Sequence, residues 1–180
     1  MTTQSRQPKG TPVGGQFAGK ANPESDVALE PSWPGFTRQI ETVNNIRVES
    51  WVDTDGRFQD PPDGSPAVHY FRPDGTVESE EHRQDGRRQD PPDGSPAMRW
   101  FRPDGTVESE EHYQSGLPQD PPDGSPALCY FRPDGTVVSE QHYQNGRFQD
   151  PSNGSPAVRR FRSDGTVESE EHWQDGIPFS

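Results

Sequence analysis

The sequence predicts an all-β protein, an extended and twisted antiparallel sheet of tandem 30-residue β-hairpin repeats with a disordered N-terminal tail. First, a 30-residue unit that begins at Gly56 runs four times in tandem, as expected of stacked units that cannot bury an apolar side alone. Second, each unit contains one strong hairpin turn between alternating segments. Third, only 25% of the residues are hydrophobic, which is too few for one large core but enough for a thin stack.

The chain divides into a tail, a cap and the repeats. The boundaries are a basic, Gly- and Pro-rich tail over 1–32, a degenerate capping hairpin over 33–55, repeats over 56–85, 86–115, 116–145 and 146–175, and a C-terminal tail over 176–180. The first segment shows neither a strand nor a helix period, so it is expected to be disordered. Within it, RQPKGTPVGGQFA resembles a short N-terminal peptide of high-GC Gram-positive bacteria and their phages, which suggests a bacterial or phage source.

The cap is expected to be a hairpin. Apolar and polar residues alternate on both sides of Asn44-Asn45, and asparagine tolerates the positive φ of a two-residue turn. This pattern predicts strands near 36–43 and 46–52. An atypical first unit protects the end of a stack.

Each repeat is expected to bend at its Arg-Pro-Asp-Gly-Thr segment, residues 72–76 in the first unit. Proline, aspartate and glycine suit successive positions of a type I turn followed by a G1 bulge. The register inferred from this turn places Phe71 opposite Val77, Tyr70 opposite Glu78 and Val68 opposite Glu80. The proline-rich QDPPDGSP segment then leads to the next hairpin, because it cannot form an inner strand.

Strand alternation then sorts the side chains into two faces. The odd-numbered face is the expected core, with a phenylalanine ladder and a neighbouring valine ladder. These ladders are Phe71, Phe101, Phe131 and Phe161, and Val77, Val107, Val137 and Val167.

The even-numbered face is the candidate partner-binding surface. It is expected to carry an aromatic row, a glutamate row and a histidine row: Tyr70, Trp100, Tyr130 and Arg160; Glu80, Glu110, Glu140 and Glu170; and His82, His112, His142 and His172. Aromatic side chains beside acceptor groups suit contact with a protein partner. The alternative is that the aromatic rings only cover the second side of a thin sheet. Residues 68–70 and their equivalents vary most between repeats, as either a tuned surface or neutral drift would produce.

Metal binding and catalysis find no support in the pattern, so no metal, cofactor or catalytic residue is expected. Glu-x-His recurs four times, but equivalent histidines would lie two strands, roughly 9–10 Å, apart. Zinc requires ligands within about 2.0–2.3 Å of one ion. The carboxylates are repeated, whereas an active site is a single constellation in a pocket. Cys129 lies where other repeats have histidine or arginine, and it is interpreted as incidental.

Charge and composition restrict the partners. The net charge is −13, which disfavours nucleic acid because phosphate backbones would be repelled. The same charge is also explained by solubility and by protection of strand edges. No apolar run is long enough to span a membrane, and the N-terminus lacks a signal-peptide core. The single cysteine fits a reducing compartment, so a cytoplasmic location is expected, with a phage particle as the alternative.

The unit SPAVxxFRPDGTVESEEHYQDGRxQD resembles the MORN-repeat variant of YwqK-type antitoxin-like bacterial proteins. The matching residues are Phe71, Asp74, Gly75, Glu80, Tyr113, Asp85 and Gly86 with their repeats. The resemblance covers about two-thirds of the chain. It implies a sheet of stacked hairpins and a protein-interaction role, with an antitoxin-like function. Arg83 at the closing aromatic position and the proline-rich connector depart from the family pattern.

We therefore expect a non-catalytic, protein-binding repeat protein of unknown oligomeric state, possessing no enzymatic activity. The alternative function is a structural or spacer component of a phage particle or cell-surface assembly. A disordered acidic spacer is a third alternative, which far-UV circular dichroism would distinguish.

Overall fold

The structure is a computed structural model that describes residues 33–180, and in these residues every regular element is a β-strand. The all-β prediction is thus confirmed, while the tail predicted over 1–32 lies outside the described residues. None of the described residues form a helix of the length and apolarity that crossing a bilayer requires.

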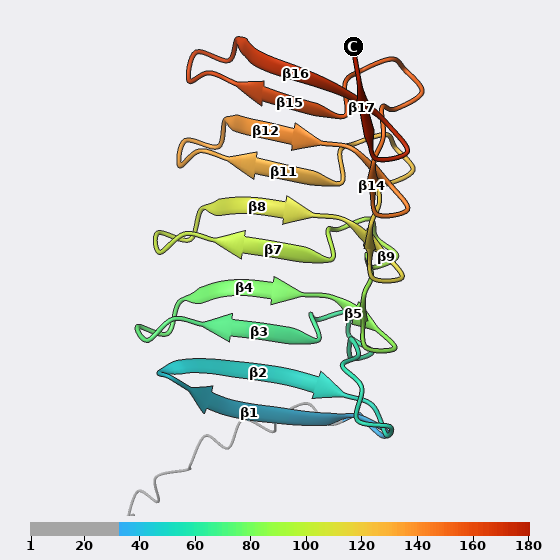
Figure 1. Cartoon of the computed structure of the whole chain (residues 1–180). Coiled ribbons are helices and arrows are strands. Elements are labelled where there is room, and N and C mark those ends of the chain that lie inside the picture. The colour runs from blue at the N-terminus through green and yellow to red at the C-terminus, as the bar shows by residue number, and fades with distance from the viewer. Residues whose placement is uncertain (1–32) are drawn as a thin grey trace, which may run out of the picture. The chain divides into compact units, whose positions relative to one another are not determined.

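The strands fall into one long sheet and three short hairpins. The long sheet contains β1 (Thr37–Val43), β2 (Ile46–Val52), β3 (Val68–Phe71), β4 (Val77–Glu81), β7 (Met98–Phe101), β8 (Val107–Glu111), β11 (Leu128–Phe131), β12 (Val137–Gln141), β15 (Val158–Phe161), β16 (Val167–Gln174) and β17 (Ile177–Phe179). The short hairpins are β5 (Arg83–Gln84) with β6 (Arg87–Arg88), β9 (Tyr113–Gln114) with β10 (Leu117–Pro118), and β13 (Tyr143–Gln144) with β14 (Arg147–Phe148). Figure 1 shows the long strands stacked in chain order, and β5, β9, β14 and β17 following one another along one end of them.

The first hairpin has the predicted turn. β1 pairs with β2 in antiparallel register, and Asn44 and Asn45 both have positive φ, 52° and 65°. This is the left-handed conformation that a two-residue turn demands. β2 then pairs with β3, so the cap continues directly into the repeats.

The predicted turn of each repeat is also present. Arg72 N–H donates to the Thr76 carbonyl at 2.8 Å, and Gly75, with φ of 88°, donates its N–H to the Arg72 carbonyl at 2.9 Å. The Asp74 carboxylate accepts from the Thr76 N–H and hydroxyl at 2.9 and 2.7 Å. Local hydrogen bonds of this kind hold a turn without tertiary support.

Arginine side chains connect successive repeats near these turns. Arg72 Nη1 donates to the Val77 carbonyl at 2.6 Å, and Nη2 donates to the Phe101 carbonyl in the next repeat. The same arrangement links Arg102 to the carbonyls of Val107 and Phe131. A planar guanidinium can donate to two acceptors at once, which an ammonium group on a flexible stem does less well.

The predicted register is correct at the turn and wrong beyond it. Phe71 does lie opposite Val77, but Tyr70 lies opposite Ser79 instead of Glu78 and Val68 lies opposite Glu81 instead of Glu80, because the register shifts between Tyr70 and Phe71. The shift leaves Glu78 as an extra residue, a β-bulge. One extra residue moves every later side chain of that strand to the other face.

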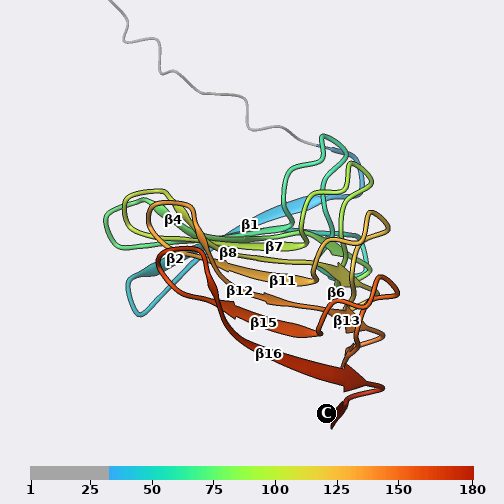
Figure 2. The ribbon, with the colours of Figure 1, turned by 90° about the horizontal axis from the view of Figure 1, so that it is seen from above.

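The predicted core is corrected in consequence. The phenylalanine ladder is half-buried, and Val167 is exposed. The buried apolar residues lie instead at the other end of the strands: Val52, Ala67, Ala97, Ala127, Ala157, Val68, Met98 and Val158. They lie where the proline-rich connectors, the long sheet and the short hairpins meet, because only there does a second layer cover the sheet (Figure 2).

The short hairpins were not predicted, although their turns carry a recognisable signal. Asp85-Gly86 has φ values of 51° and 77°, and Ser115, Asn145 and Asp175 repeat the left-handed conformation. Asp-Gly and Asn-Gly are typical of two-residue hairpin turns. Gly86 N–H donates to the Phe58 carbonyl at 2.9 Å, and the equivalent bonds in the later repeats stack each short hairpin on the preceding unit.

Candidate interaction surfaces

The structure divides the twelve predicted site residues among three places. The aromatic residues and Arg160 lie on the face of the long sheet that also carries Val68, which we call the inner face. The glutamates lie on the opposite, outer face, because they share pairs with His69, Arg99, Cys129 and Arg159. The histidines lie beyond the ends of the strands or in β16, bonded to the connectors. The three rows therefore do not form the single surface expected from the sequence. The bulge at Glu78 places the glutamates on the face opposite the aromatic residues, and the connector aspartates hold the histidines.

On the inner face, bulky and small side chains alternate from strand to strand. The cross-strand order is Tyr70, Ser79, Trp100, Ser109, Tyr130, Ser139 and Arg160, and we call this the aromatic–serine row. Ser79 is 0% exposed, whereas the three aromatic side chains are half-buried, like the phenylalanine ladder, and Arg160 is exposed. Ser109 and Ser139 are also buried, at 3% and 8% exposed, so the accessible part of the row consists of the rings and Arg160.

The tyrosine hydroxyls of this row keep their protons over a wide pH range. Burial, followed by the charge of Glu81, raises the pKa of Tyr70, and burial followed by Glu111 raises the pKa of Tyr130. A protonated hydroxyl is both a hydrogen-bond donor and an acceptor. The row therefore offers aromatic surface together with polar donors.

Next to the aromatic–serine row, arginine side chains of the first short hairpin pack against a buried glutamate of the long sheet. Glu81 is 3% exposed and is bonded to Arg83 at 2.5 Å and to Arg88 at 3.2 Å. The Arg83 guanidinium lies 5.4 Å from the ring centre of Phe58. Buried charges require partners of this kind.

At the junction of the third and fourth repeats an aromatic set replaces this charged set. Gln141 takes the position of the buried glutamate, the ring centres of Tyr143 and Phe148 are 4.4 Å apart, and Trp173 lies 5.0 Å beyond. The Tyr143 hydroxyl donates to Gln141 at 3.2 Å. The closing position is thus a packing position that contacts residue 81 or its equivalent: Arg83 bonds to Glu81, Tyr113 to Glu111 and Tyr143 to Gln141.

The outer face carries a row in which acids alternate with other groups. Its order is Glu49, His69, Glu80, Arg99, Glu110, Cys129, Glu140, Arg159 and Glu170, and we call it the charged row. Arg99 joins two strands, with Nη1 3.0 Å from Glu80 and Nε 2.9 Å from Glu110. Neighbouring opposite charges stabilise adjacent strands.

Cys129 interrupts this alternation. It lies between Glu110 and Glu140 in the position that Arg99 and Arg159 occupy in other repeats. Burial, followed by the charges of Glu140 and Glu110, raises the pKa of the Cys129 thiol to about 12. A nucleophilic cysteine needs a lowered pKa, so this thiol is protonated and unreactive at neutral pH.

Each of the four histidines is bonded to an aspartate in the preceding connector. The Nδ1 atoms lie 2.5–2.8 Å from Oδ2 of Asp60, Asp90, Asp120 and Asp150. These aspartates were missed in the sequence, although they occur in each QDP segment. No group of three or more His, Cys, Asp or Glu side chains within residues 33–180 is arranged to hold a metal ion.

The connector aspartates also organise the backbone. Asp120 Oδ1 accepts the N–H groups of Ala127 at 2.8 Å and of Tyr143 at 2.9 Å. For Asp150, burial raises the pKa, but hydrogen bonds from the Trp173 N–H, His172 and the Ala157 N–H outweigh it and the net pKa is lowered. The role of these groups is structural, since one carboxylate joins three chain segments.

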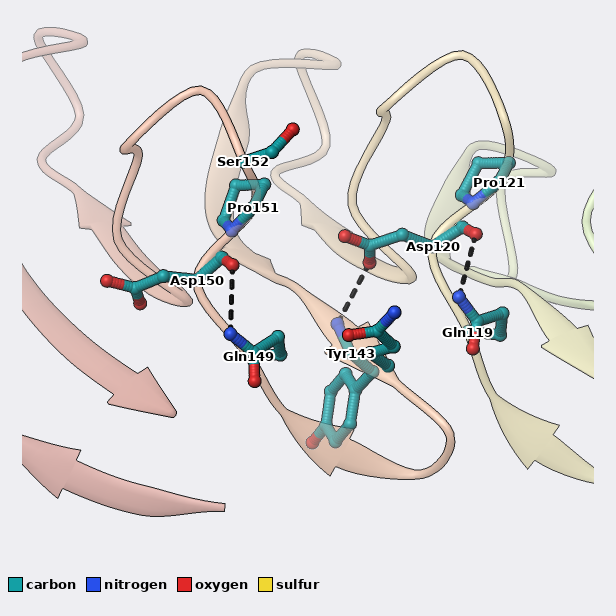
Figure 3. A pocket seen from close by; sticks show the side chains of 9 residues that line it. Gln119, Asp120, Pro121, Tyr143, Gln149, Asp150, Pro151 and Ser152 are labelled. Atoms are coloured by element: carbon teal, nitrogen blue, oxygen red, sulfur yellow. Dashed lines mark hydrogen bonds between the residues drawn. The ribbon is translucent and has the colours of Figure 1, made fainter. Parts of the chain in front are cut away.

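Polar clefts open between successive connectors. In one of about 440 Å³, Gln119, Asp120 and Pro121 form one wall and Gln149, Asp150 and Pro151 form the other (Figure 3). The glutamines are already engaged, because Gln119 Nε2 donates to the Asp120 carbonyl at 3.3 Å and Oε1 accepts the Asn145 N–H at 2.8 Å. A cleft of similar composition lies one repeat earlier. These clefts are a consequence of stacking and contain no group set apart for chemistry.

Comparisons with known proteins add no relative. No protein-family model matches the chain, and no curated protein sequence matches it significantly. The aromatic–serine row and the charged row are therefore candidate interaction surfaces because of their geometry in this structure alone. Of the two, the aromatic–serine row places three large aromatic side chains in one line.

Proposed function

We propose that the repeat array is a non-catalytic interaction protein that holds an extended segment of a protein partner along the aromatic–serine row. The observation that carries this proposal is the recurrence of Tyr70, Trp100 and Tyr130 on every second strand of one face. Large aromatic side chains with a polar tip dominate protein recognition sites. The contact residues proposed from the sequence are thereby reduced to the aromatic row and Arg160.

The spacing of the row favours a particular backbone conformation in the partner. Neighbouring strands lie about 4.7–4.9 Å apart, so rings on every second strand are separated by roughly 9.4–9.8 Å. A polyproline II segment advances about 3.1 Å per residue with three residues per turn, or roughly 9.3 Å per turn. One turn of such a segment therefore matches one repeat.

The chemistry of the row suits the same partner. Aromatic-lined surfaces bind proline-rich segments in several recognition domains, and a polyproline II chain has carbonyl groups with no internal partner. The hydroxyls of Tyr70 and Tyr130 retain their protons and can donate to those carbonyls. The array would then bind without a pocket, because the proline rings would pack against the accessible parts of the aromatic rings.

The test is selection of a proline-rich peptide library against the full chain, followed by titration calorimetry of the selected peptides. Trp100→Ala is expected to weaken binding at least tenfold, as truncation of a central aromatic contact does. Phe101→Ala is the matched control, since Phe101 is the next residue and lies on the outer face. Equal losses in both variants, or binding unaffected by changing Tyr70, Trp100 and Tyr130 together, would refute the assignment.

The resemblance to antitoxin-like repeat proteins supports a toxin as the partner, in the reducing cytoplasm that a single cysteine suits. A second candidate function is a spacer in a phage particle or surface assembly. It is favoured by the one-dimensional stacking of near-identical units (Figure 1). A neighbouring toxin-like reading frame favours the first function, and a neighbouring virion gene cluster favours the second.

A further inference from the structure

An open cleft lies on the outer face of the sheet, where the second and third repeats meet. It encloses about 280 Å³ and is lined by Thr106, Val107, Glu110, Phe131 and Gly135. Val107 and Phe131 give it an apolar wall, and Glu110 is the one charged group among these lining residues. Apolar surface beside a single carboxylate suits a cation that is carried on an apolar stem.

The cap shows which group fits between a phenylalanine and a glutamate of this face. Arg47 lies opposite Phe71 in the register, and its guanidinium carbon is 4.4 Å from the centre of the Phe71 ring. The same guanidinium forms an ion pair with Glu49. A guanidinium is attracted both by an aromatic face and by a carboxylate. The cap therefore contains its own arginine at this place.

The cleft occupies the equivalent place in the later repeats. In the pairing of the strands, Phe131 takes the place of Phe71. Glu110 takes the place of Glu49, because each glutamate lies opposite the residue two positions before the phenylalanine. The residue that corresponds to the cap arginine is Glu108, which is exposed. The strand thus supplies an acid where the cap supplies a guanidinium.

Glu110 also has fewer cationic neighbours than its counterpart in the cap. Glu49 is paired with two arginines of the cap. Within residues 33–180, Glu110 is paired with Arg99 alone, whose Nε lies 2.9 Å from its Oε1. On the following strand, Cys129 stands where a second arginine could pair with it. One side of the carboxylate therefore remains available to a cation from outside.

Arg102, in the turn of the second repeat, does not fill this place. Its Nη1 donates to the Val107 carbonyl and its Nη2 donates to the Phe131 carbonyl. It is not one of the residues that line the cleft. These two bonds join the strands that carry the apolar wall, so Arg102 helps to build the cleft and leaves it open.

We propose that this cleft, which we call the arginine cleft, binds an arginine side chain of a partner protein. The guanidinium would lie over the Phe131 ring and bond to Glu110, with the apolar stem against Val107. Arginine is favoured over lysine, because a planar guanidinium stacks on a ring and matches a carboxylate. The proposal does not depend on the aromatic–serine row, which lies on the opposite face of the sheet.

The charge of the protein supports a basic partner. The chain has a net charge of −13, and the charged row around the arginine cleft contains more glutamates than arginines. A surface of one sign attracts and orients a segment of the opposite sign. General attraction of this kind does not distinguish arginine from lysine, so a comparison of the two isolates the contribution of the cleft.

The test is a titration of the full chain with the capped peptide Gly-Gly-Arg-Gly-Gly, followed by NMR of the phenylalanine ring signals. The ring signals of Phe131, identified by their loss in Phe131→Leu, should shift until they saturate. The matched peptide with lysine in place of arginine should bind at least about twofold more weakly. Phe131→Leu should weaken binding of the arginine peptide about two- to fivefold, as expected for a cation–aromatic contact at an accessible site.

Two pairs of variants separate the arginine cleft from the overall charge. Glu110→Gln should weaken binding about two- to fivefold, whereas Glu168→Gln removes the same charge from an exposed position outside the cleft and should have no effect. Glu108→Arg places an arginine where the cap has its own, so it should block the peptide while every lining residue is kept. Glu168→Arg is its control. Circular dichroism checks that each variant is folded.

Several results would overturn the proposal. Equal binding of the arginine and lysine peptides, or equal effects of Glu110→Gln and Glu168→Gln, would show attraction to net charge alone. Unchanged Phe131 signals in the wild-type protein, or full binding by Glu108→Arg, would refute the assignment of the cleft. Binding that appears only after Arg6→Gln would identify the N-terminal segment of the chain itself as the occupant, instead of a separate partner.

Discussion

Replacing Asp120 by alanine removes one carboxylate that joins the connector, the next long hairpin and the short hairpin of its own repeat. Oδ1 accepts two backbone N–H groups at 2.8 and 2.9 Å, and Oδ2 lies 2.7 Å from His142 Nδ1. The side chain is only 18% exposed, so water replaces these bonds poorly. The repeat junction should therefore be the weakest point of the variant.

The size of the effect follows from the three bonds. Hydrogen bonds to charged groups contribute about 1.5–3 kcal/mol each, but bonds that share one carboxylate are not additive. We therefore expect Asp120→Ala to lower the free energy of unfolding by roughly 3–5 kcal/mol. Asp120→Asn keeps an oxygen that can accept both N–H groups, so it should lose only about 1–2 kcal/mol.

The assay is equilibrium urea unfolding followed by circular dichroism and tryptophan fluorescence. Asp123→Ala is the control, because Asp123 belongs to the same connector but is exposed and accepts only from Ser125; its unfolding midpoint should barely move. Repeat arrays can unfold in parts, so a separation of the two signals in Asp120→Ala would locate the broken junction. A midpoint equal to that of Asp123→Ala would show that the carboxylate does not hold the repeat together.

Three further predictions concern other junctions. Glu81→Ala should cost roughly 3–5 kcal/mol, because it leaves two arginines without their buried acid. Exchanging Glu81, Arg83 and Arg88 for the residues at the equivalent positions Gln141, Tyr143 and Phe148 should instead leave the urea midpoint nearly unchanged. Arg72→Lys should destabilise more than Arg162→Lys, since Arg162 bonds only to the Val167 carbonyl of its own repeat, and equal midpoints would contradict the role of the repeat-to-repeat bond. Burial raises the pKa of the Cys129 thiol in the folded protein to about 12. The contribution of the neutral thiol to the free energy of unfolding is therefore complete below the unfolded-state pKa near 9, and it is lost as the pH rises toward 12. Folded protein should thus react with iodoacetamide at pH 8 on the order of a thousandfold more slowly than unfolded protein, and rapid modification of the native thiol would contradict that burial.

The candidate site could be predicted only in part, because the sequence specifies which residues recur but not which face they share. Tyr70 and Trp100 do lie in one row, as the 30-residue period requires. Glu80 was assigned to the same face and lies on the opposite one, since a single extra residue at Glu78 reverses the alternation. Asp60 and its equivalents could have been found from their repetition, but nothing local indicates that a carboxylate reaches a histidine 22 residues later.

Local chemistry determined the turns and therefore the strands. Asn44-Asn45, Pro73-Asp74-Gly75 and the 30-residue period specify backbone conformations that depend on neighbouring residues alone, so they could be predicted without a structure. The location of the core depended on contacts between distant segments. Phe71 is apolar in sequence yet half-buried, whereas Ser79 is polar and fully buried, because the second layer covers one face of the sheet and only at the end where connectors and short hairpins meet. Burial is a property of what packs above a residue, and only the tertiary structure decides that.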